Sequence, residues 1–421
     1  MADDPIDPAP SGPGLSRRHT FSAFRHRNYR LFFFGQLVSV IGTAMQGTAL
    51  PWLVYTTTQS ALWLGIVAAL TQLPSLFLWV FVGALVDRLP KRELIVCTQS
   101  AAMCLAFTLA ALVHWQVVRV WHIAAIALAS GLVLAIDIPA RQSFVVEMVG
   151  REDLMNAIAL NSSCFNMGRI LGPVSAGFLI LIGMDWCFFL NGLSFVAVIG
   201  GLLLMHLPPW QPSRSRPPIL AHTIEGIRYA RSQPRIVIAL TMMATVAVFG
   251  LPYQTLTAVF AHDVLRVGAK GMGLMGGAVG VGALASTLIL ARRQRPTWTL
   301  FLGVMLAMAG GLYCYGLSKA FRLSLAILVG VGACSVAFTI TCNTTLQLAS
   351  PDAMRGRVMG LYAMSFVGLG PIGSFLSGAL ANWQGAPRAV CLNAAICATV
   401  GTGVALWLKA HRAGIGAAVA R

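Results

Sequence analysis

The chain has 421 residues, of which 57% are hydrophobic and 10% are charged. Soluble domains carry about 25% charged residues, so this composition excludes a protein whose whole surface faces water. The formal net charge is +17, but long apolar runs exclude a nucleic-acid-binding protein, and basic residues in short loops are typical of membrane topology signals. We therefore expect an all-α membrane protein.

Twelve segments are apolar enough to cross a bilayer as helices, which takes about 20 residues each. Residues 1–28 precede them and are polar and rich in Pro and Asp, which predicts a disordered tail. The first six spans form an N-terminal bundle over residues 29–206, the other six form a C-terminal bundle over residues 236–409, and residues 410–421 are a second tail. In chain order the predicted spans are 30–56, 60–86, 93–115, 121–146, 154–182, 186–206, 236–261, 271–291, 297–317, 322–347, 356–382 and 386–408.

A longer break at residues 207–235 separates the two bundles. It holds five prolines between residues 208 and 218 and then a short amphipathic stretch, in which Leu220, Ile224 and Ile227 share a face opposite Arg228 and Arg231. This pattern is typical of a helix that lies on an anionic leaflet. A plain linker explains the segment equally well.

The distribution of basic residues predicts the orientation. If the N-terminus lies in the cytoplasm, most of the 30 lysines and arginines fall in cytoplasmic segments, including residues 207–235 and the C-terminal tail. Cytoplasmic loops of membrane proteins carry such an excess. We expect a multi-pass protein of the plasma membrane, the inner membrane in bacteria, with both termini in the cytoplasm.

The two halves share landmarks at a nearly constant offset. The tripeptide Gly-Ala-Leu occurs at 83–85 and again at 282–284, and Gly-Pro occurs at 172–173 and again at 370–371, offsets of 199 and 198 residues. Six spans per half place both halves the same way up, which predicts a pseudo-twofold axis along the membrane normal. Two such bundles can rock around a central cavity, which is the geometry of alternating access.

The loop between the second and third spans carries a charged motif, GALVDRLPKR at residues 83–92. Gly83 permits a close helix approach, and Asp87 is an anion that suits the N-terminal end of a neighbouring helix. The motif resembles the signature of the major facilitator superfamily, G-x-L-x-D-R-x-x-[RK]-[RK], with Arg88, Lys91 and Arg92 at its basic positions.

This resemblance implies the major facilitator fold, with Asp87 as a gating latch. The implied partner of the latch is the eleventh span, which begins with Gly356-x-x-x-Gly360, a close-packing pattern. The alternative is an ordinary basic turn that only sets topology.

The fifth span carries a second motif of small residues. It contains Gly168, Gly172, Pro173 and Gly177 in the order G-x-x-x-G-P-x-x-A-G. This run is similar to the antiporter motif of superfamily exporters, G-x-x-x-G-P-x-x-G-G, with Ala176 in place of one glycine. The similarity implies export, whereas the alternative is ordinary small-residue packing between helices.

Three further runs resemble one branch of the superfamily, which holds enterobactin exporters and macrolide efflux pumps. These runs are DIPARQ at 137–142, NAIALN at 156–161 and RGRVMGL at 355–361. The resemblance extends over roughly residues 20–410. It implies a monomeric secondary transporter that exports a small amphipathic molecule, a drug or a siderophore-like compound, by alternating access. Since the chain has no nucleotide-binding P-loop, we expect a proton or other ion gradient to drive antiport.

Polar side chains within the spans are candidates for the substrate and coupling cavity, because polar groups in lipid are costly and usually face a cavity. Amides can instead join helices. The candidates are Gln46, Gln72, Asp137, Arg141, Asn161, Arg169, Gln254 and Asn343.

The charged members of this set suggest two roles. Asp137 is a candidate proton carrier, but Arg141 lies four residues away and can hold it in a structural pair. Arg169 has no local partner. If it faces the cavity, it favours anionic substrates; alternatively, Asp137 or Asn161 satisfies it.

Two other function classes remain as alternatives, a membrane-embedded enzyme and a transporter-like sensor. The sequence has no H-E-x-x-H or G-x-S-x-G motif and no paired carboxylates within a span, so we expect no enzyme. Nine cysteines lack the spacing of metal ligands, so we expect neither a metal nor a cofactor. The expected partners are a small-molecule substrate, an ion gradient and membrane lipids, but no nucleic acid.

Overall fold

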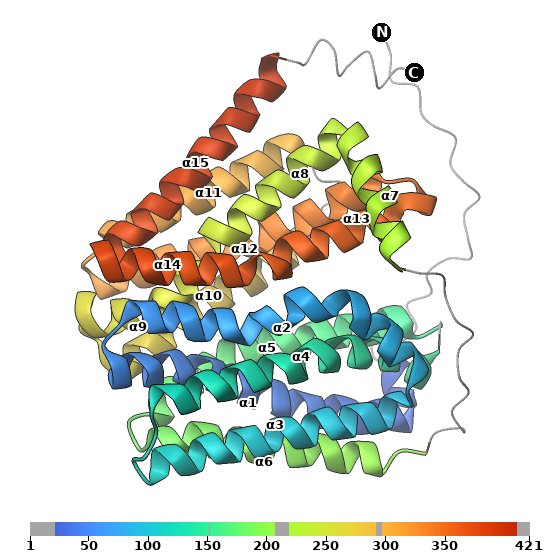
Figure 1. Cartoon of the computed structure of the whole chain (residues 1–421), viewed down its shortest axis with the longest axis vertical. Coiled ribbons are helices and arrows are strands. Elements are labelled where there is room, and N and C mark those ends of the chain that lie inside the picture. The colour runs from blue at the N-terminus through green and yellow to red at the C-terminus, as the bar shows by residue number, and fades with distance from the viewer. Residues whose placement is uncertain (1–21, 151, 207–218, 292–296, 411–421) are drawn as a thin grey trace.

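The computed structural model describes residues 22–150, 152–206, 219–291 and 297–410, and these residues are almost all helical (Figure 1). The predicted tails fall largely outside the described residues. A short helix, η1 (Ser22–Arg25), precedes the N-terminal bundle. The helices of that bundle are α1 (Arg27–Thr58), α2 (Ala61–Arg88), α3 (Lys91–His114), α4 (Val120–Val149), α5 (Leu154–Leu179) and α6 (Met184–Leu203).

The C-terminal bundle also crosses the molecule six times, but its first and fifth passages are broken into shorter helices. The seventh passage runs through α8 (Pro234–Thr245), η2 (Val246–Gly250), η3 (Pro252–Leu256), α9 (Thr257–Val259) and η4 (Phe260–Val264). The remaining passages are α10 (Gly268–Ala291), α11 (Trp298–Leu317), α12 (Phe321–Ala349), the combination of α13 (Asp352–Ala363), η5 (Met364–Gly368) and α14 (Gly370–Gln384), and finally α15 (Ala386–Ala410).

Among the described residues, eleven helical segments are long and apolar enough to cross a membrane, and α5 is not one of them. It has 26 residues, enough to span a bilayer. Its hydropathy is low because polar residues such as Asn161, Asn166 and Arg169 lie along it. It packs between α1 and α10 and completes the twelve passages, so the predicted twelve-helix fold in two bundles is confirmed.

The two bundles lie against each other at one end of the molecule, and their helices diverge toward the other end (Figure 1). We call the end where the bundles meet the far end; there α1 ends and α2 begins. We call the end where they diverge the linker end; there α7 (Ile219–Ser232) lies against α13. There the Arg357 guanidinium lies 2.5 Å from the Glu225 carboxylate, so the helix between the bundles is tied to the C-terminal bundle. The side chains of Leu220 and Ile224 fall outside the described residues.

Two pairs of helices make the most extensive contacts between the bundles, α2 with α14 and α5 with α10. The pseudo-twofold axis that relates the two halves maps one of these helix pairs onto the other. Each crossing has a glycine on both helices, because a Cβ on Gly378 would lie 2.7 Å from the Cα of Gly65, and a Cβ on Gly273 would lie 2.8 Å from the Cα of Gly177. Contacts this short are not tolerated by side chains, so these glycines let the halves approach closely.

Candidate substrate cavity

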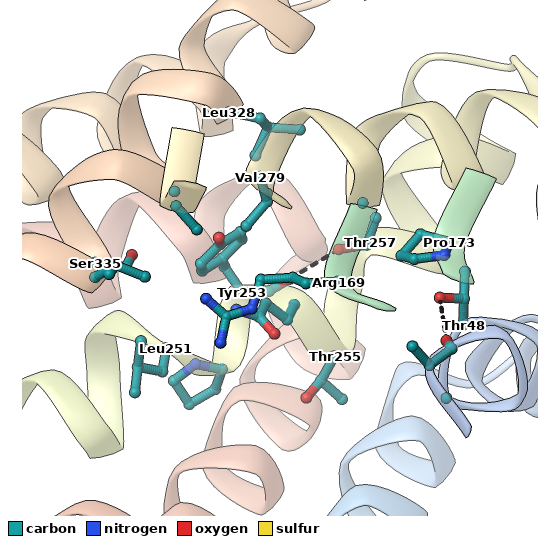
Figure 2. A pocket seen from close by; sticks show the side chains of 18 of the residues that line it. Thr48, Arg169, Pro173, Leu251, Tyr253, Thr255, Thr257, Val279, Leu328 and Ser335 are labelled. Atoms are coloured by element: carbon teal, nitrogen blue, oxygen red, sulfur yellow. Dashed lines mark hydrogen bonds between the residues drawn. The ribbon is translucent and has the colours of Figure 1, made fainter. Parts of the chain in front are cut away.

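A cavity of about 920 Å³ lies between the two bundles (Figure 2). Both halves contribute to it, since its lining residues come from α1, α2 and α5 and from the seventh, eighth, tenth and eleventh passages. This volume is in the range of sites that enclose a small organic molecule.

The lining combines apolar side chains with uncharged polar groups. Arg169 is the only charged side chain among the described lining residues. The polar members are Thr48, Gln72, Ser162, Asn166, Arg169, Tyr253, Gln254, Thr255, Thr257, Thr287, Ser335, Thr339 and Ser374.

The small residues of α5 orient its polar face. A Cβ on Gly168 would lie 2.4 Å from Val40, and a Cβ on Gly172 would lie 2.4 Å from Ala44, so this face of α5 packs tightly on α1. The other face carries Ser162, Asn166, Arg169 and Pro173 at intervals of four, three and four residues, which places them on one side of a helix. All four line the cavity.

The break in the seventh passage supplies the opposite wall. Pro252 has no backbone N–H and interrupts regular helix geometry, here between a π-helical segment and a 3-10 segment. As a result the consecutive residues Leu251 to Thr255 all line the cavity. Tyr253 is 2% exposed. Its hydroxyl makes no hydrogen bond of normal geometry with a described residue, although Gln254 and Ser335 lie near it.

Three of the predicted cavity residues line this cavity: Gln72, Arg169 and Gln254. The amide nitrogen of Gln72 also lies 3.4 Å from the Ser374 hydroxyl, which joins α2 to α14 across the two halves. Figure 2 shows the guanidinium of Arg169 beside Tyr253, in the middle of the site.

Three other candidates, all uncharged, do not line it, which corrects their predicted placement. Gln46 accepts a hydrogen bond of 2.7 Å from Asn191 and so joins α1 to α6. Asn343 accepts one of 2.5 Å from Gln347 on the same helix. Asn161 is next to the lining residue Ser162 but does not itself line the cavity.

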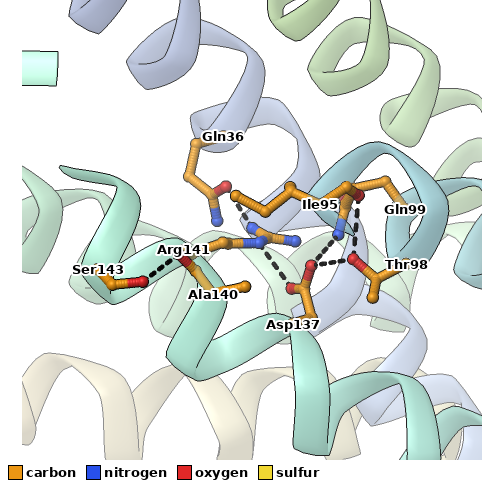
Figure 3. A network of polar contacts seen from close by, with 8 residues as sticks. All are labelled: Gln36, Ile95, Thr98, Gln99, Asp137, Ala140, Arg141 and Ser143. Atoms are coloured by element: carbon orange, nitrogen blue, oxygen red, sulfur yellow. Dashed lines mark hydrogen bonds and ion pairs between the residues drawn. The ribbon is translucent and has the colours of Figure 1, made fainter. Parts of the chain in front are cut away.

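The charged pair also lies outside the cavity, within the N-terminal bundle (Figure 3). Asp137 is 4% exposed, and its carboxylate lies 2.6 Å from the Arg141 guanidinium. The carboxylate also accepts hydrogen bonds from Thr98 at 2.7 Å and Gln99 at 2.9 Å, while Arg141 donates to Gln36. This network joins α1, α3 and α4 and satisfies both charges without Arg169.

The gating motif is described only in part. The surroundings of Gly83 and the side chains of Asp87 and Arg88 fall outside the described residues. Lys91 forms an ion pair with Glu147 on α4, and Arg92 donates a hydrogen bond of 2.8 Å to the backbone oxygen of Leu203. Both contacts stay within the N-terminal bundle.

The eleventh span does not make the close contact that its glycine spacing predicted. A Cβ on Gly356 or Gly360 would meet nothing within 4 Å, and α13 packs on α7 and α12 of its own half. The reason is the divergence of the bundles at the linker end, which holds this helix away from the N-terminal bundle.

Sequence reasoning missed Asn166 and Tyr253 as cavity residues. The signal for Asn166 was available, because it precedes Arg169 by three residues and shares its helix face. The signal for Tyr253 was weaker, because only the break at Pro252 turns it toward the other half.

Comparisons with known proteins agree with this architecture. The profile of the transmembrane secretion effector family matches residues 18–413. The enterobactin exporter EntS of Shigella flexneri is 26% identical over 370 residues, which cover 84% of this chain and 85% of that protein. Among solved structures, the nucleoside transporter NupG has a TM-score of 0.70 at 12% identity, covering 91% of this chain and 99% of that chain. A D-xylose–proton symporter has a TM-score of 0.69 at 15% identity, covering 92% and 97%.

These two solved structures establish the fold alone, whereas the profile match covers nearly the whole chain. The chain therefore belongs to the transmembrane secretion effector family of major facilitator transporters.

Proposed function

We propose that the chain is a secondary active transporter that exports a small amphipathic molecule by alternating access, coupled to proton antiport. The observation that carries this proposal is the cavity shared by two pseudo-symmetric bundles that meet at one end and diverge at the other. Two such bundles can expose the same cavity to either side of a membrane by rocking about it.

The basic residues support an orientation with the linker end in the cytoplasm. The cavity then loads from the cytoplasm while the far end is closed. At the far end the Ser60 hydroxyl donates a hydrogen bond of 3.1 Å to Asn382, next to the glycine crossing of α2 and α14. Outward opening breaks these contacts and brings the linker ends of the bundles together.

The gating motif has a place in this cycle. When the linker end closes, Asp87 approaches the start of α13, where the helix N-terminus favours an anion. The open space beside Gly356 and Gly360 leaves room for that approach. The residues of the motif thus act in the state in which the cavity faces outward.

Export is supported by the EntS relatives, which are named enterobactin exporters, and by the antiporter-like motif of α5. Pro173 and Gly177 of this motif pack against α10 of the other half, so the motif takes part in closing the far end. The mixed lining suits an amphipathic substrate. No observation favours the enzyme or the sensor, and the described lining residues include no His, Cys, Asp or Glu.

Transport into inside-out membrane vesicles tests the proposal. With enterobactin or a macrolide as the probe, we expect uptake that needs an imposed proton gradient, acid inside, and that a protonophore abolishes. Vesicles without the protein are the control. Uptake that does not respond to the gradient argues against antiport, and absence of uptake for both probes argues against export of this substrate class.

Labelling tests the orientation separately. In a background without native cysteines, Gln116→Cys at the far end is expected to react with an impermeant maleimide added outside intact cells. Ser232→Cys, at the end of α7, is expected to react only after the membrane is broken. The reverse pattern overturns the orientation.

A further inference from the structure

No residue that the structure describes compensates the charge of Arg169. It makes no hydrogen bond or ion pair with any residue that the structure describes, and its side chain is exposed to the cavity. An arginine stays protonated under physiological conditions, so it cannot lose this charge on burial. A charge in the middle of a membrane protein normally pairs with another group.

Two acidic side chains within the spans are already engaged elsewhere. Asp137 is held by Arg141, Thr98 and Gln99 in the N-terminal bundle. Asp263, at the far end, pairs with His262. The missing counter-charge of Arg169 is therefore not one of these carboxylates.

A second polar group, the hydroxyl of Tyr253, faces Arg169 from the other half, with Gln254 and Ser335 near it. The hydroxyl of Tyr253 is buried and lacks a hydrogen bond of normal geometry to the described residues, and it lies close enough to Arg169 for an electrostatic interaction. Buried polar groups nearly always have a partner, so an unsatisfied one at a binding cavity calls for an explanation. Arg169 and Tyr253 can both donate to one oxygen, and Asn166 lines the same wall one turn away.

The backbone at Arg169 is held in place by the other bundle. A Cβ on Gly280 of α10 would lie 2.7 Å from the Arg169 carbonyl oxygen, so α5 and α10 cross tightly at this residue. Arg169 belongs to the N-terminal bundle and Tyr253 to the C-terminal bundle. A ligand held by both therefore bridges the two halves that must move apart.

We infer that Arg169 and Tyr253 form an anion-binding subsite that takes a carboxylate or phenolate oxygen of the substrate. The apolar body of that substrate lies along Phe165, Pro173 and Phe366, which line the same cavity. The substrate class is thus a small organic anion with an apolar framework. This inference rests on the proposed function, because it assigns the substrate class of the same cavity.

Equilibrium binding to the purified full-length protein in nanodiscs tests the subsite, with three probes of one shape and different charge. The probes are naphthalene-2-carboxylate, neutral 2-naphthamide and cationic 2-naphthylmethylammonium. We expect the carboxylate to bind about ten-fold more tightly than the amide, because charge-assisted hydrogen bonds are roughly twice as strong as neutral ones.

Variants then assign the effect to the two residues. Arg169→Gln is expected to weaken carboxylate binding about ten-fold and to leave amide binding within about two-fold. Arg169→Lys keeps the charge and is expected to restore part of the carboxylate preference, while Tyr253→Phe weakens carboxylate binding by a smaller factor. Arg388→Gln, at an exposed position of α15, is the matched control and is expected to bind all three probes like the unmodified protein.

Equal binding of the three probes, equal loss for all probes in Arg169→Gln, or no carboxylate binding at millimolar concentration overturns the inference. The binding experiment and the vesicle uptake experiment can fail independently. Carboxylate-selective binding without gradient-driven uptake refutes the transporter and leaves the subsite standing. Gradient-driven uptake that ignores probe charge refutes the subsite and leaves the transporter standing.

Discussion

The hydroxyl of Tyr55 on α1 donates a hydrogen bond to the carboxylate of Asp263 on η4, and this bond crosses from one bundle to the other at the far end. His262 contributes to the same cluster, with its Nδ1 atom 2.5 Å from the other oxygen of Asp263 and its ring against those of Trp52 and Tyr55. The contact can exist only while the far end is closed, so it stabilises the state described here over the opposite one.

The first prediction concerns this bond. Tyr55→Phe removes the donor and keeps the ring, and we expect the equilibrium to shift toward the state with the far end open. Because the Asp263 side chain is 46% exposed, the shift is about 1 kcal/mol, roughly five-fold in the equilibrium. Spin-label distances across the far end measure it. Tyr313→Phe, an exposed tyrosine on α11, is the control, and an unchanged distance distribution in Tyr55→Phe contradicts the prediction.

The second prediction concerns the glycine crossings that close the far end. Gly378→Ala places a Cβ 2.7 Å from the Ala61 carbonyl oxygen, and Gly273→Ala does the equivalent at the symmetry-related crossing. Either variant is expected to insert normally and to lower transport about ten-fold or more, because a clash in tight packing costs about 1–3 kcal/mol. Cross-linking of a Ser60→Cys and Asn382→Cys pair should fall in parallel.

Gly303→Ala on α11 is the matched control for these variants. A Cβ there meets nothing within 4 Å, so transport and cross-linking should remain normal. Full cross-linking in the Gly378→Ala and Gly273→Ala variants would show that the crossings tolerate a side chain.

The third prediction concerns the buried pair in the N-terminal bundle. Asp137→Asn leaves the Arg141 charge without its carboxylate, and breaking a buried pair from one side costs about 3–5 kcal/mol. We expect lower abundance and a lower melting temperature, with an unchanged pH dependence in the transport that remains. Removing both charges, in Asp137→Asn with Arg141→Gln, should restore part of the stability. Normal abundance with an altered pH profile would instead make Asp137 the proton carrier.

The fourth prediction concerns acid and the N-terminal segment. Asp153, which lies just before α5, accepts hydrogen bonds from Ser22 and from His26, and these hold the pKa of its carboxyl below the usual range. A carboxyl with a lowered pKa stabilises the folded contact above its ordinary pKa, and this contribution is lost as the pH falls through the lowered value. We expect η1 to resist proteolysis at neutral pH and to become cleavable in acid.

Asp153→Asn should make η1 cleavable at neutral pH, since it removes the charge without changing the shape. Glu152→Gln, at the exposed neighbouring position, serves as the control. Equal protection of Asp153→Asn and the unmodified protein would show that other contacts hold η1, such as the hydrogen bond from the Ala23 amide to Asn156.

The sequence by itself determined the number of passages, the two-bundle architecture and the family motifs. Span length and apolar composition are local properties, and a bilayer accepts few alternatives to a helix for such segments. The repeat of Gly-Ala-Leu and Gly-Pro revealed the symmetry for a similar reason, because equivalent helices in the two halves need small residues at equivalent crossings. The glycine crossings between the bundles, Gly177 with Gly273 and Gly65 with Gly378, follow the same symmetry, although these glycines are not part of the repeated motifs.

Only the tertiary structure decided which polar side chain meets which partner. Membrane energetics require a buried polar group to be satisfied, but they do not say whether a helix neighbour or a cavity satisfies it. Asp137 and Arg169 therefore looked alike in sequence, since each is a charge within a span. The rotation of each helix separates them: the glycines of α5 pack on α1 and turn Arg169 into the cavity, while the packing of α4 on α3 buries Asp137 against Thr98 and Gln99.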